Sequence, residues 1–202
     1  IFGWIDADQG KLWGVSTTAW FWLTILIPVI HQIYVWLGWR AELGSQWFSK
    51  RWGEKAIRVF GAGFIPLFAG RVISLVVLAI SNAGSLDIPT WLRILLGIVL
   101  TIPSIYLGYS VARYFGLTRA LGADHFDPTY RTMPFVRKGI FKYTTNGMYI
   151  YGFFVLWAIG FAFASKAALI AAGFNHLYIW IHYFTVEKPD MAVIYGEQPQ
   201  GR

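Results

Sequence analysis

The sequence contains no cysteine and few charged residues for its size. Without cysteine, the chain has no disulfide, no thiolate metal site and no cysteine nucleophile. Only 13% of its 202 residues are charged, whereas soluble domains carry about a quarter. The shortage of charge and a hydrophobic content of 56% are typical of an integral membrane protein.

Aromatic residues and a positive charge excess are what the chain has in quantity. Aromatic residues make up 19% of the sequence and include 11 tryptophans, which collect at membrane interfaces. The mean hydropathy is +0.51. A net charge of +7 can indicate nucleic-acid binding, but in so apolar a chain it is more typical of basic cytoplasmic loops. We therefore predict a membrane protein without a nucleic-acid partner.

Long stretches with almost no charged residues predict the fold. A helix needs about 20 apolar residues to cross a bilayer, and we expect about five such spans, at residues 17–37, 59–83, 91–112, 143–165 and 167–186. Only Lys166 separates the last two, which predicts a C-terminal helical hairpin with small residues that allow close packing. The expected fold is an all-α, polytopic membrane protein, with residues 1–202 as one transmembrane domain.

The loop charges predict the orientation of these spans. The basic loops 40–58 and 113–142 lie on one side of a five-span chain, and the turn 82–90, which has no lysine or arginine, lies on the other. The positive-inside rule places the basic loops and the C-terminus in the cytoplasm. Lys166, on the outer turn, is the exception. The sequence does not indicate an oligomeric state.

Both ends of the predicted hairpin lie at the cytoplasmic boundary. The segment 139–149 enters the fourth span, and Glu187 follows the fifth. Because the two ends of a tight hairpin are neighbours, their polar side chains should converge. The side chains expected to meet there are Asn146, Tyr149, His182 and Glu187.

Several short motifs in the last 90 residues resemble the small membrane methyltransferases, namely the phosphatidylethanolamine N-methyltransferases and the isoprenylcysteine carboxyl methyltransferases. The matching pieces are Tyr114-Phe115-Gly116, Ala120-Leu121-Gly122, Gly139-Ile-Phe-Lys-Tyr143, Asn146-Gly-Met-Tyr149, Gly152, Glu187-Lys188-Pro189 and Ile194-Tyr195-Gly196. The Asn-x-Met-Tyr and later Glu-x-Pro forms favour the phospholipid branch. The sequence departs from the family pattern at Gly147, where proline is usual, and at Lys188, where many members have a second glutamate.

The resemblance implies an S-adenosylmethionine-dependent methyltransferase that acts on a lipid or lipidated substrate, favouring a phosphatidylethanolamine-type phospholipid. It implies a methyltransferase core over residues 113–202, with its cofactor pocket on the cytoplasmic face. The cofactor-binding residues it implies are Gly122, Gly139, Tyr143, Asn146, Gly147, Met148, Tyr149 and Glu187. The catalytic residues it implies are Glu187, His182 and Tyr149.

Each of these roles has a structural alternative. Glu187 suits a cationic cofactor, but it can also cap the last helix. His182 can accept the proton of the reacting amine, or it can be a hydrogen-bonded helix residue. Met148 can simply pack. The rival functions are prenylcysteine methylation, NADPH-dependent sterol reduction on a related fold, and a non-catalytic lipid-binding relative.

Two further features invite a site. Arg71 interrupts the second span, where a charge is costly; it either snorkels or satisfies a broken helix, or it binds the anionic head of the substrate. His31, in the first span, is expected to be packed and neutral. Asp124, His125 and Asp127 lie close together in sequence, but their spacing is weak evidence for a metal, and no metal site is predicted.

Overall fold

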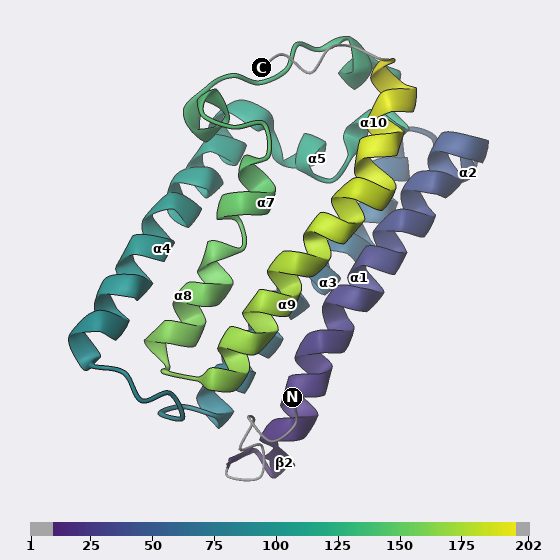
Figure 1. Cartoon of the computed structure of the whole chain (residues 1–202). Coiled ribbons are helices and arrows are strands. Elements are labelled where there is room, and N and C mark those ends of the chain that lie inside the picture. The colour runs from purple at the N-terminus through teal and green to yellow at the C-terminus, as the bar shows by residue number, and fades with distance from the viewer. Residues whose placement is uncertain (1–9, 197–202) are drawn as a thin grey trace.

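The computed structural model describes residues 10–196, and they form a bundle of long helices that lie side by side (Figure 1). A small antiparallel hairpin of β1 (Lys11–Leu12) and β2 (Val15–Ser16) leads into α1 (Thr17–Ser45). Its register pairs Lys11 with Ser16 and Leu12 with Val15. Ser16 then caps α1, its hydroxyl accepting a hydrogen bond from the Ala19 amide at 3.3 Å.

Helices α1 and α3 pack together along their length. After α1 the chain turns through α2 (Trp47–Trp52) and a 3-10 turn at Gly53–Lys55 into α3 (Ala56–Ser81). Threonine hydroxyls join the two long helices: Thr17 donates to the Ser81 carbonyl at 3.0 Å, and Thr24 donates to the Ser74 carbonyl at 3.1 Å. In lipid there is no hydrophobic driving force between helices, so hydrogen bonds from hydroxyl groups and close packing of small side chains hold them together.

Helix α4 (Thr90–Ser110) lies at the edge of the bundle and continues as a π-helical turn, η3 (Val111–Phe115). The chain then crosses one end of the bundle in short elements: α5 (Leu117–Ala120), α6 (Ala123–Phe126), η4 (Pro128–Thr132) and η5 (Gly139–Lys142). This crossing brings the polar segment over the ends of α1 and α4. It places residues far apart in sequence at one end of the molecule.

The C-terminal part differs from the predicted spans in two places. The helix expected from residue 143 begins at Gly147 and is interrupted, giving α7 (Gly147–Tyr151) and α8 (Phe154–Ala162). At the interruption, the Tyr151 carbonyl accepts a hydrogen bond from the Ser104 hydroxyl of α4 at 2.8 Å. Helix α9 (Lys166–His182) does not end in a polar tail. It runs on through a π-helical turn, η6 (Tyr183–Glu187), into α10 (Lys188–Tyr195).

Alanines and glycine bring α8 and α9 close together. Ala167, Ala168, Ala171 and Ala172 are fully buried against α1, α3 and α8. A Cβ atom at Gly160 would lie 2.6 Å from the Leu169 side chain, so only glycine fits at that contact. The small side chains explain how the last helices enter the centre of the bundle.

Three helical segments in the described part of the chain are long and apolar enough to cross a membrane: Thr17–Ser45, Trp47–Ser81 and Thr90–Phe115. A shorter apolar helical stretch covers Gly147–Ala162. Large apolar side chains on these helices face outward, Ile105 of α4 at 66% exposure among them. Such a surface suits contact with lipid, and the chain is an integral membrane protein.

Candidate functional site

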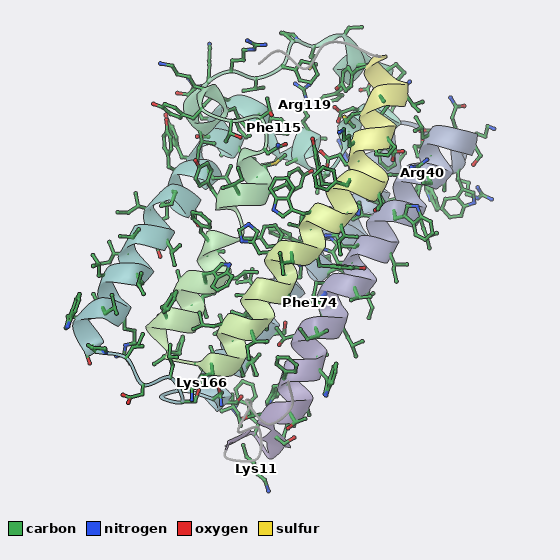
Figure 2. The ribbon with its side chains drawn as sticks, in the orientation of Figure 1. Lys11, Arg40, Phe115, Arg119, Lys166 and Phe174 are labelled. Carbon is green, nitrogen blue, oxygen red and sulfur yellow. The ribbon has the colours of Figure 1, made fainter. Side chains whose placement is uncertain are left out.

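Asp190 ties α10 to two other elements at the polar end of the bundle. Its side chain is fully buried. Its Oδ1 atom lies 3.0 Å from Nε of Arg40 on α1, and its Oδ2 atom lies 3.3 Å from Nε2 of His125 on α6. Figure 2 shows Arg40 beside the last helix, with Lys166 at the opposite end of the bundle. Asp190 therefore fixes where α10 lies.

Asp124 makes a second polar group in the same region. Its Oδ2 atom accepts a short hydrogen bond from the Tyr195 hydroxyl and lies 3.9 Å from Nε of Arg119. Burial, followed by the hydrogen bond to Asp124, raises the pKa of Tyr195 to about 12. The Tyr195 phenol therefore stays protonated at neutral pH and remains a donor to the carboxylate.

Trp39 connects this polar region with His182. Its ring stacks on the His125 ring at 4.3 Å between centroids and lies 5.6 Å from the His182 ring. The indole N–H donates to the Leu121 carbonyl at 3.3 Å. Gly122 has a positive φ of 84°, and a Cβ atom there would lie 2.5 Å from the Trp39 ring. Gly122 therefore supports the tryptophan, because no other residue fits beneath the ring.

Glu187 is the carboxylate in this region that has no partner. It is partly buried, and within residues 10–196 no donor forms a hydrogen bond or ion pair with it. Burial, followed by the negative charges of Asp124 and Asp190, raises the pKa of Glu187 to about 8. A cation bound beside Glu187 would lower this pKa and restore the negative charge of the carboxylate. The carboxyl group is therefore suited to a cationic ligand.

The structure explains one departure from the family pattern. Lys188 is exposed, with its ammonium 5.9 Å from the Phe184 ring centroid. The negative charge expected beside Glu187 is supplied instead by Asp190, three residues further along the chain and about one helical turn away. The site thus retains neighbouring carboxylates.

The segment 139–149 packs mainly on itself and on α4. Gly139 has φ of +60°, and a Cβ atom there would lie 2.5 Å from the Ser110 hydroxyl. Ser110 accepts a hydrogen bond from the Ile140 amide at 3.0 Å. Gly147 is buried, and a Cβ atom there would lie 3.3 Å from the Ile140 side chain. The two glycines therefore fold this segment tightly against the end of α4.

Tyr149 is the residue of this segment that reaches the last helix. Its ring lies 5.2 Å from the Tyr183 ring and 5.8 Å from the Trp180 ring. Met148 instead packs into the apolar cluster around Leu107. An aromatic wall of three rings therefore precedes Glu187 on the same side of the molecule as α7.

The predicted residues are only partly brought together. Glu187 lies near Asp124 and Asp190, and His182 near Trp39, while Tyr149 contacts Tyr183. Tyr143 is 73% exposed. No hydrogen bond or ring contact in the described residues joins Tyr143 or Asn146 to Glu187. Arg71 lies deeper in the bundle, 4% exposed, with its Nε donating to Asn175 Oδ1 at 3.1 Å.

Sequence reasoning missed Trp39, Arg40, Asp190 and Tyr195 as individual members of this region. Asp190 follows Glu187 at helical spacing, but the sequence analysis treated the residues after Glu187 as a polar tail and not as a helix. His125 and Asp124 were considered only as metal ligands; the structure gives them the protein partners Asp190 and Tyr195. Within residues 10–196 no three His, Cys, Asp or Glu side chains form a group suited to a metal ion.

Comparison with known proteins gives the family. No curated protein and no solved structure matches the chain significantly. The family model described as phospholipid methyltransferase matches residues 92–198, which is more than half of the chain and includes α4 from its third residue and every later helix. The chain therefore belongs to the phospholipid methyltransferase family, whose members use S-adenosylmethionine to methylate phosphatidylethanolamine-type lipids, as the motifs between Tyr114 and Gly196 predicted.

Proposed function

We propose that the polar end of the bundle binds S-adenosylmethionine through Glu187 and presents it to the amine of a phosphatidylethanolamine-type phospholipid. The observation that carries this proposal is the carboxyl group of Glu187. It is partly buried, has no donor among the described residues, and stands near two other carboxylates. A site of this kind lacks a cation, and the sulfonium of the cofactor is one.

The residues present suit such a ligand. The rings of Tyr149, Trp180 and Tyr183 form an aromatic wall next to the helical turn that carries Glu187. Aromatic faces and carboxylates both attract a cation. We assign cofactor binding to the eight residues predicted from the sequence, with three kinds of contribution. Glu187 and Tyr149 contact the ligand, Gly122 and Gly139 shape the backbone, and the 143–148 segment closes the site.

Bound there, the cofactor supplies a methyl group on a positively charged sulfur. That methyl group would pass to the amine nitrogen, and the sulfur would keep the electron pair of the broken carbon–sulfur bond. The acceptor must first lose a proton, because an ammonium nitrogen has no free electron pair. We propose that His182 accepts this proton. It lies against Trp39 and about one turn before Glu187.

Most of the catalytic effect comes from positioning. In-line displacement needs the nitrogen, the carbon and the sulfur aligned. Asp190 holds α10 through Arg40 and His125, and this contact fixes Glu187 relative to α1. Arg71, predicted to hold the anionic head of the substrate, is an electrostatic neighbour of His182, as is Asp190.

We also propose that five helical segments cross the membrane: α1, α3, α4, the α7–α8 pair and α9. Support comes from α8 and α9, which lie alongside the three long apolar helices. The positive-inside rule places the Glu187 end of the bundle on the cytoplasmic face, because residues 40–58 and 113–142 hold most of the lysines and arginines.

A binding experiment tests the proposed function. S-adenosylhomocysteine and NADPH are titrated separately into the purified protein in detergent by calorimetry, and methylation of phosphatidylethanolamine is measured in mixed micelles. We expect S-adenosylhomocysteine to bind and NADPH not to bind. Glu187→Gln should weaken the binding of S-adenosylmethionine by about tenfold or more, since an interaction with a charge is lost.

Lys188→Gln, which changes the exposed neighbour, is the matched control and should leave the affinity within about twofold. An affinity of Glu187→Gln equal to that of the wild type would remove Glu187 from the site. Binding of NADPH alone would overturn the assignment of the cofactor.

A further inference from the structure

A buried polar cluster lies at mid-depth in the bundle, apart from the carboxylates. It consists of Arg71 on α3, His31 on α1 and Asn175 on α9. His31 stands fourteen residues from either end of α1. All three side chains are buried, with exposures of 4%, 2% and 0%. The cluster therefore lies within the region that the membrane surrounds.

Arg71 is held in place by neutral partners. Its Nε donates to Asn175 Oδ1 at 3.1 Å, and its Nη1 lies 3.4 Å from Nδ1 of His31. The guanidinium carbon lies 5.1 Å from the Phe153 ring centroid. No carboxylate in the described part of the chain pairs with Arg71. An arginine stays charged in proteins, so a positive charge is buried here without a counter-charge.

The bonding capacity that remains unused in this cluster is all of one kind. Arginine only donates, so Nδ1 of His31 must be the acceptor in their contact, and Nε2 then carries the ring proton. Neither Nη2 of Arg71 nor Nε2 of His31 has a partner within the protein. Both polar atoms of Asn175 have a partner, because its amide nitrogen also donates to the Ala171 carbonyl at 2.9 Å. Two donors and one positive charge therefore lack an acceptor.

This cluster points toward the proposed catalytic region. Side chains on a helix tilt toward its N-terminus, so Arg71 on α3 leans toward the end of the bundle that carries α2. His182 is near both groups, because Arg71, Asp190 and His125 are all among its electrostatic neighbours. Along α9, the seven residues from Asn175 to His182 correspond to about 10 Å.

We propose that Arg71, positioned by His31 and Asn175, is an oxyanion-binding site inside the bundle. It forms the part of the methyl-transfer site that lies deepest in the bundle. This inference rests on the proposed function. Its ligand is the phosphate of the acceptor phospholipid or the carboxylate of the cofactor, which offer the same chemistry. An unpaired buried charge destabilises the protein, and an anion that arrives with substrate or cofactor removes this cost only in the loaded enzyme.

The test compares wild type, Arg71→Gln and Arg71→Lys, with Arg93→Gln as a control for loss of one arginine from a spanning helix. Calorimetry gives the affinity for S-adenosylhomocysteine and for 5′-methylthioadenosine, which lacks the amino-acid carboxylate. Kinetics give KM for phosphatidylethanolamine and for a long-chain alkylamine, which lacks phosphate.

If the phosphate is the ligand, Arg71→Gln raises KM for the phospholipid about tenfold or more and leaves the affinity for S-adenosylhomocysteine within about twofold. If the carboxylate is the ligand, the affinity for S-adenosylhomocysteine falls by that factor while 5′-methylthioadenosine binds as before. Arg71→Lys, which keeps the charge but loses the planar fork, should recover part of either loss.

If Arg71→Gln changes neither the KM for the phospholipid nor the affinity for S-adenosylhomocysteine, the oxyanion site is wrong. The proposed function would still stand if the wild type bound S-adenosylhomocysteine. If Arg71→Gln does not fold, the wild type decides alone. Removal of the carboxylate from one ligand, or of the phosphate from the other, must then weaken binding about tenfold or more. The proposal is wrong if S-adenosylhomocysteine binds no more tightly than 5′-methylthioadenosine and phosphatidylethanolamine binds no more tightly than the alkylamine.

Discussion

Glu187 and Asp190 are about one helical turn apart and have opposite surroundings. Asp190 is fully buried and has a cation and a histidine as partners, whereas Glu187 is partly buried and has no donor among the described residues. A structural carboxylate is satisfied by the protein itself. A carboxylate that binds a cationic ligand cannot already be paired within the protein, because the internal partner would compete with that ligand. This difference separates the positioning residue from the proposed binding residue.

The raised pKa of Glu187 predicts how stability depends on pH. The folded-state pKa is about 8 against an ordinary value of 4.5, so the folded protein holds a proton in this interval that the unfolded chain releases. The contribution of Glu187 to stability is therefore present below pH 4.5 and is lost as the pH rises through about 8.

Glu187→Gln stays uncharged, so the variant should gain stability relative to wild type as the pH rises through that interval. The measurement is the thermal unfolding midpoint in detergent at about pH 5 and about pH 9. Glu54→Gln, at an exposed position, is the control and should show no such trend. A difference between Glu187→Gln and wild type that is constant with pH would contradict the prediction.

Gly147 replaces the proline that the family pattern has at this position. It is the first residue of α7, where proline is tolerated because its amide makes no intrahelical bond. A Cβ atom there would lie 3.3 Å from Ile140, a tight contact. The glycine is therefore compatible with the helix start that the family proline would favour.

We expect Gly147→Pro to fold with a free energy of unfolding within about 1 kcal/mol of wild type, because a less flexible unfolded chain offsets the crowding at Ile140. Chemical unfolding measures this difference. Gly139→Pro is the contrasting variant, since a φ of +60° excludes proline, and it should be strongly destabilised. Equal losses at both positions would show that the start of α7 is not as described.

At the scale of elements, part of the structure followed from the sequence and part did not. The stretches with almost no charged residues predicted α1, α3 and α4, because crossing a lipid bilayer demands a long apolar run. The motifs at Asn146 and Glu187 predicted the family and its cofactor. The helical continuation past Glu187 was not predicted, because the residues beyond it are polar; Pro189 is tolerated there because it lies in the first turn of α10.

The partners of Asp190 could not be predicted for another reason. Arg40 lies 150 residues earlier in the chain, and nothing in either local pattern links them. Likewise, the stacking of Trp39 on His125 depends on how the crossing segment lies over the end of α1. Contacts of this kind follow from packing between elements, which local periodicity does not encode.

The contact of α10 with α1 and α6 carries its own prediction. Asp190→Ala removes the partner of Arg40 and of buried His125, and it should lower the free energy of unfolding by about 2 kcal/mol. Chemical unfolding followed by tryptophan fluorescence measures this loss. Asp87→Ala, at an exposed loop position, should stay within about 0.5 kcal/mol of wild type. A similar loss in both variants would show that Asp190 does not hold α10.

At the scale of the whole molecule, the two ends of the bundle differ in charge and composition. The end that carries Arg40 and Arg119 contains the short crossing elements, and Lys166 lies at the other end (Figure 2). Asp190 pairs with Arg40 at the first end, and the 82–90 turn contacts Lys166 at the second. The proposed active site, the basic loops and the turn between α9 and α10 all lie at the first end. The orientation of the protein therefore decides which compartment supplies the cofactor.

The absence of cysteine permits a direct test of this orientation. Lys142→Cys and Lys166→Cys each place one thiol at an exposed position, at opposite ends. A membrane-impermeant maleimide added to intact cells should label Lys166→Cys and should label Lys142→Cys only after permeabilisation. The cysteine-free parent controls for background. The reverse pattern would place the site on the outer face.

The π-helical turn at Tyr183–Glu187 has a consequence for how relatives of this protein should be compared. A π turn holds one residue more than an α turn, and one residue rotates everything beyond it by about 100° around the helix axis. A relative that lacks the extra residue would present a different face of its last helix to Arg40 and His125. Alignments anchored at His182 and at Glu187 would then disagree by one position, and only the second would pair the carboxylates correctly.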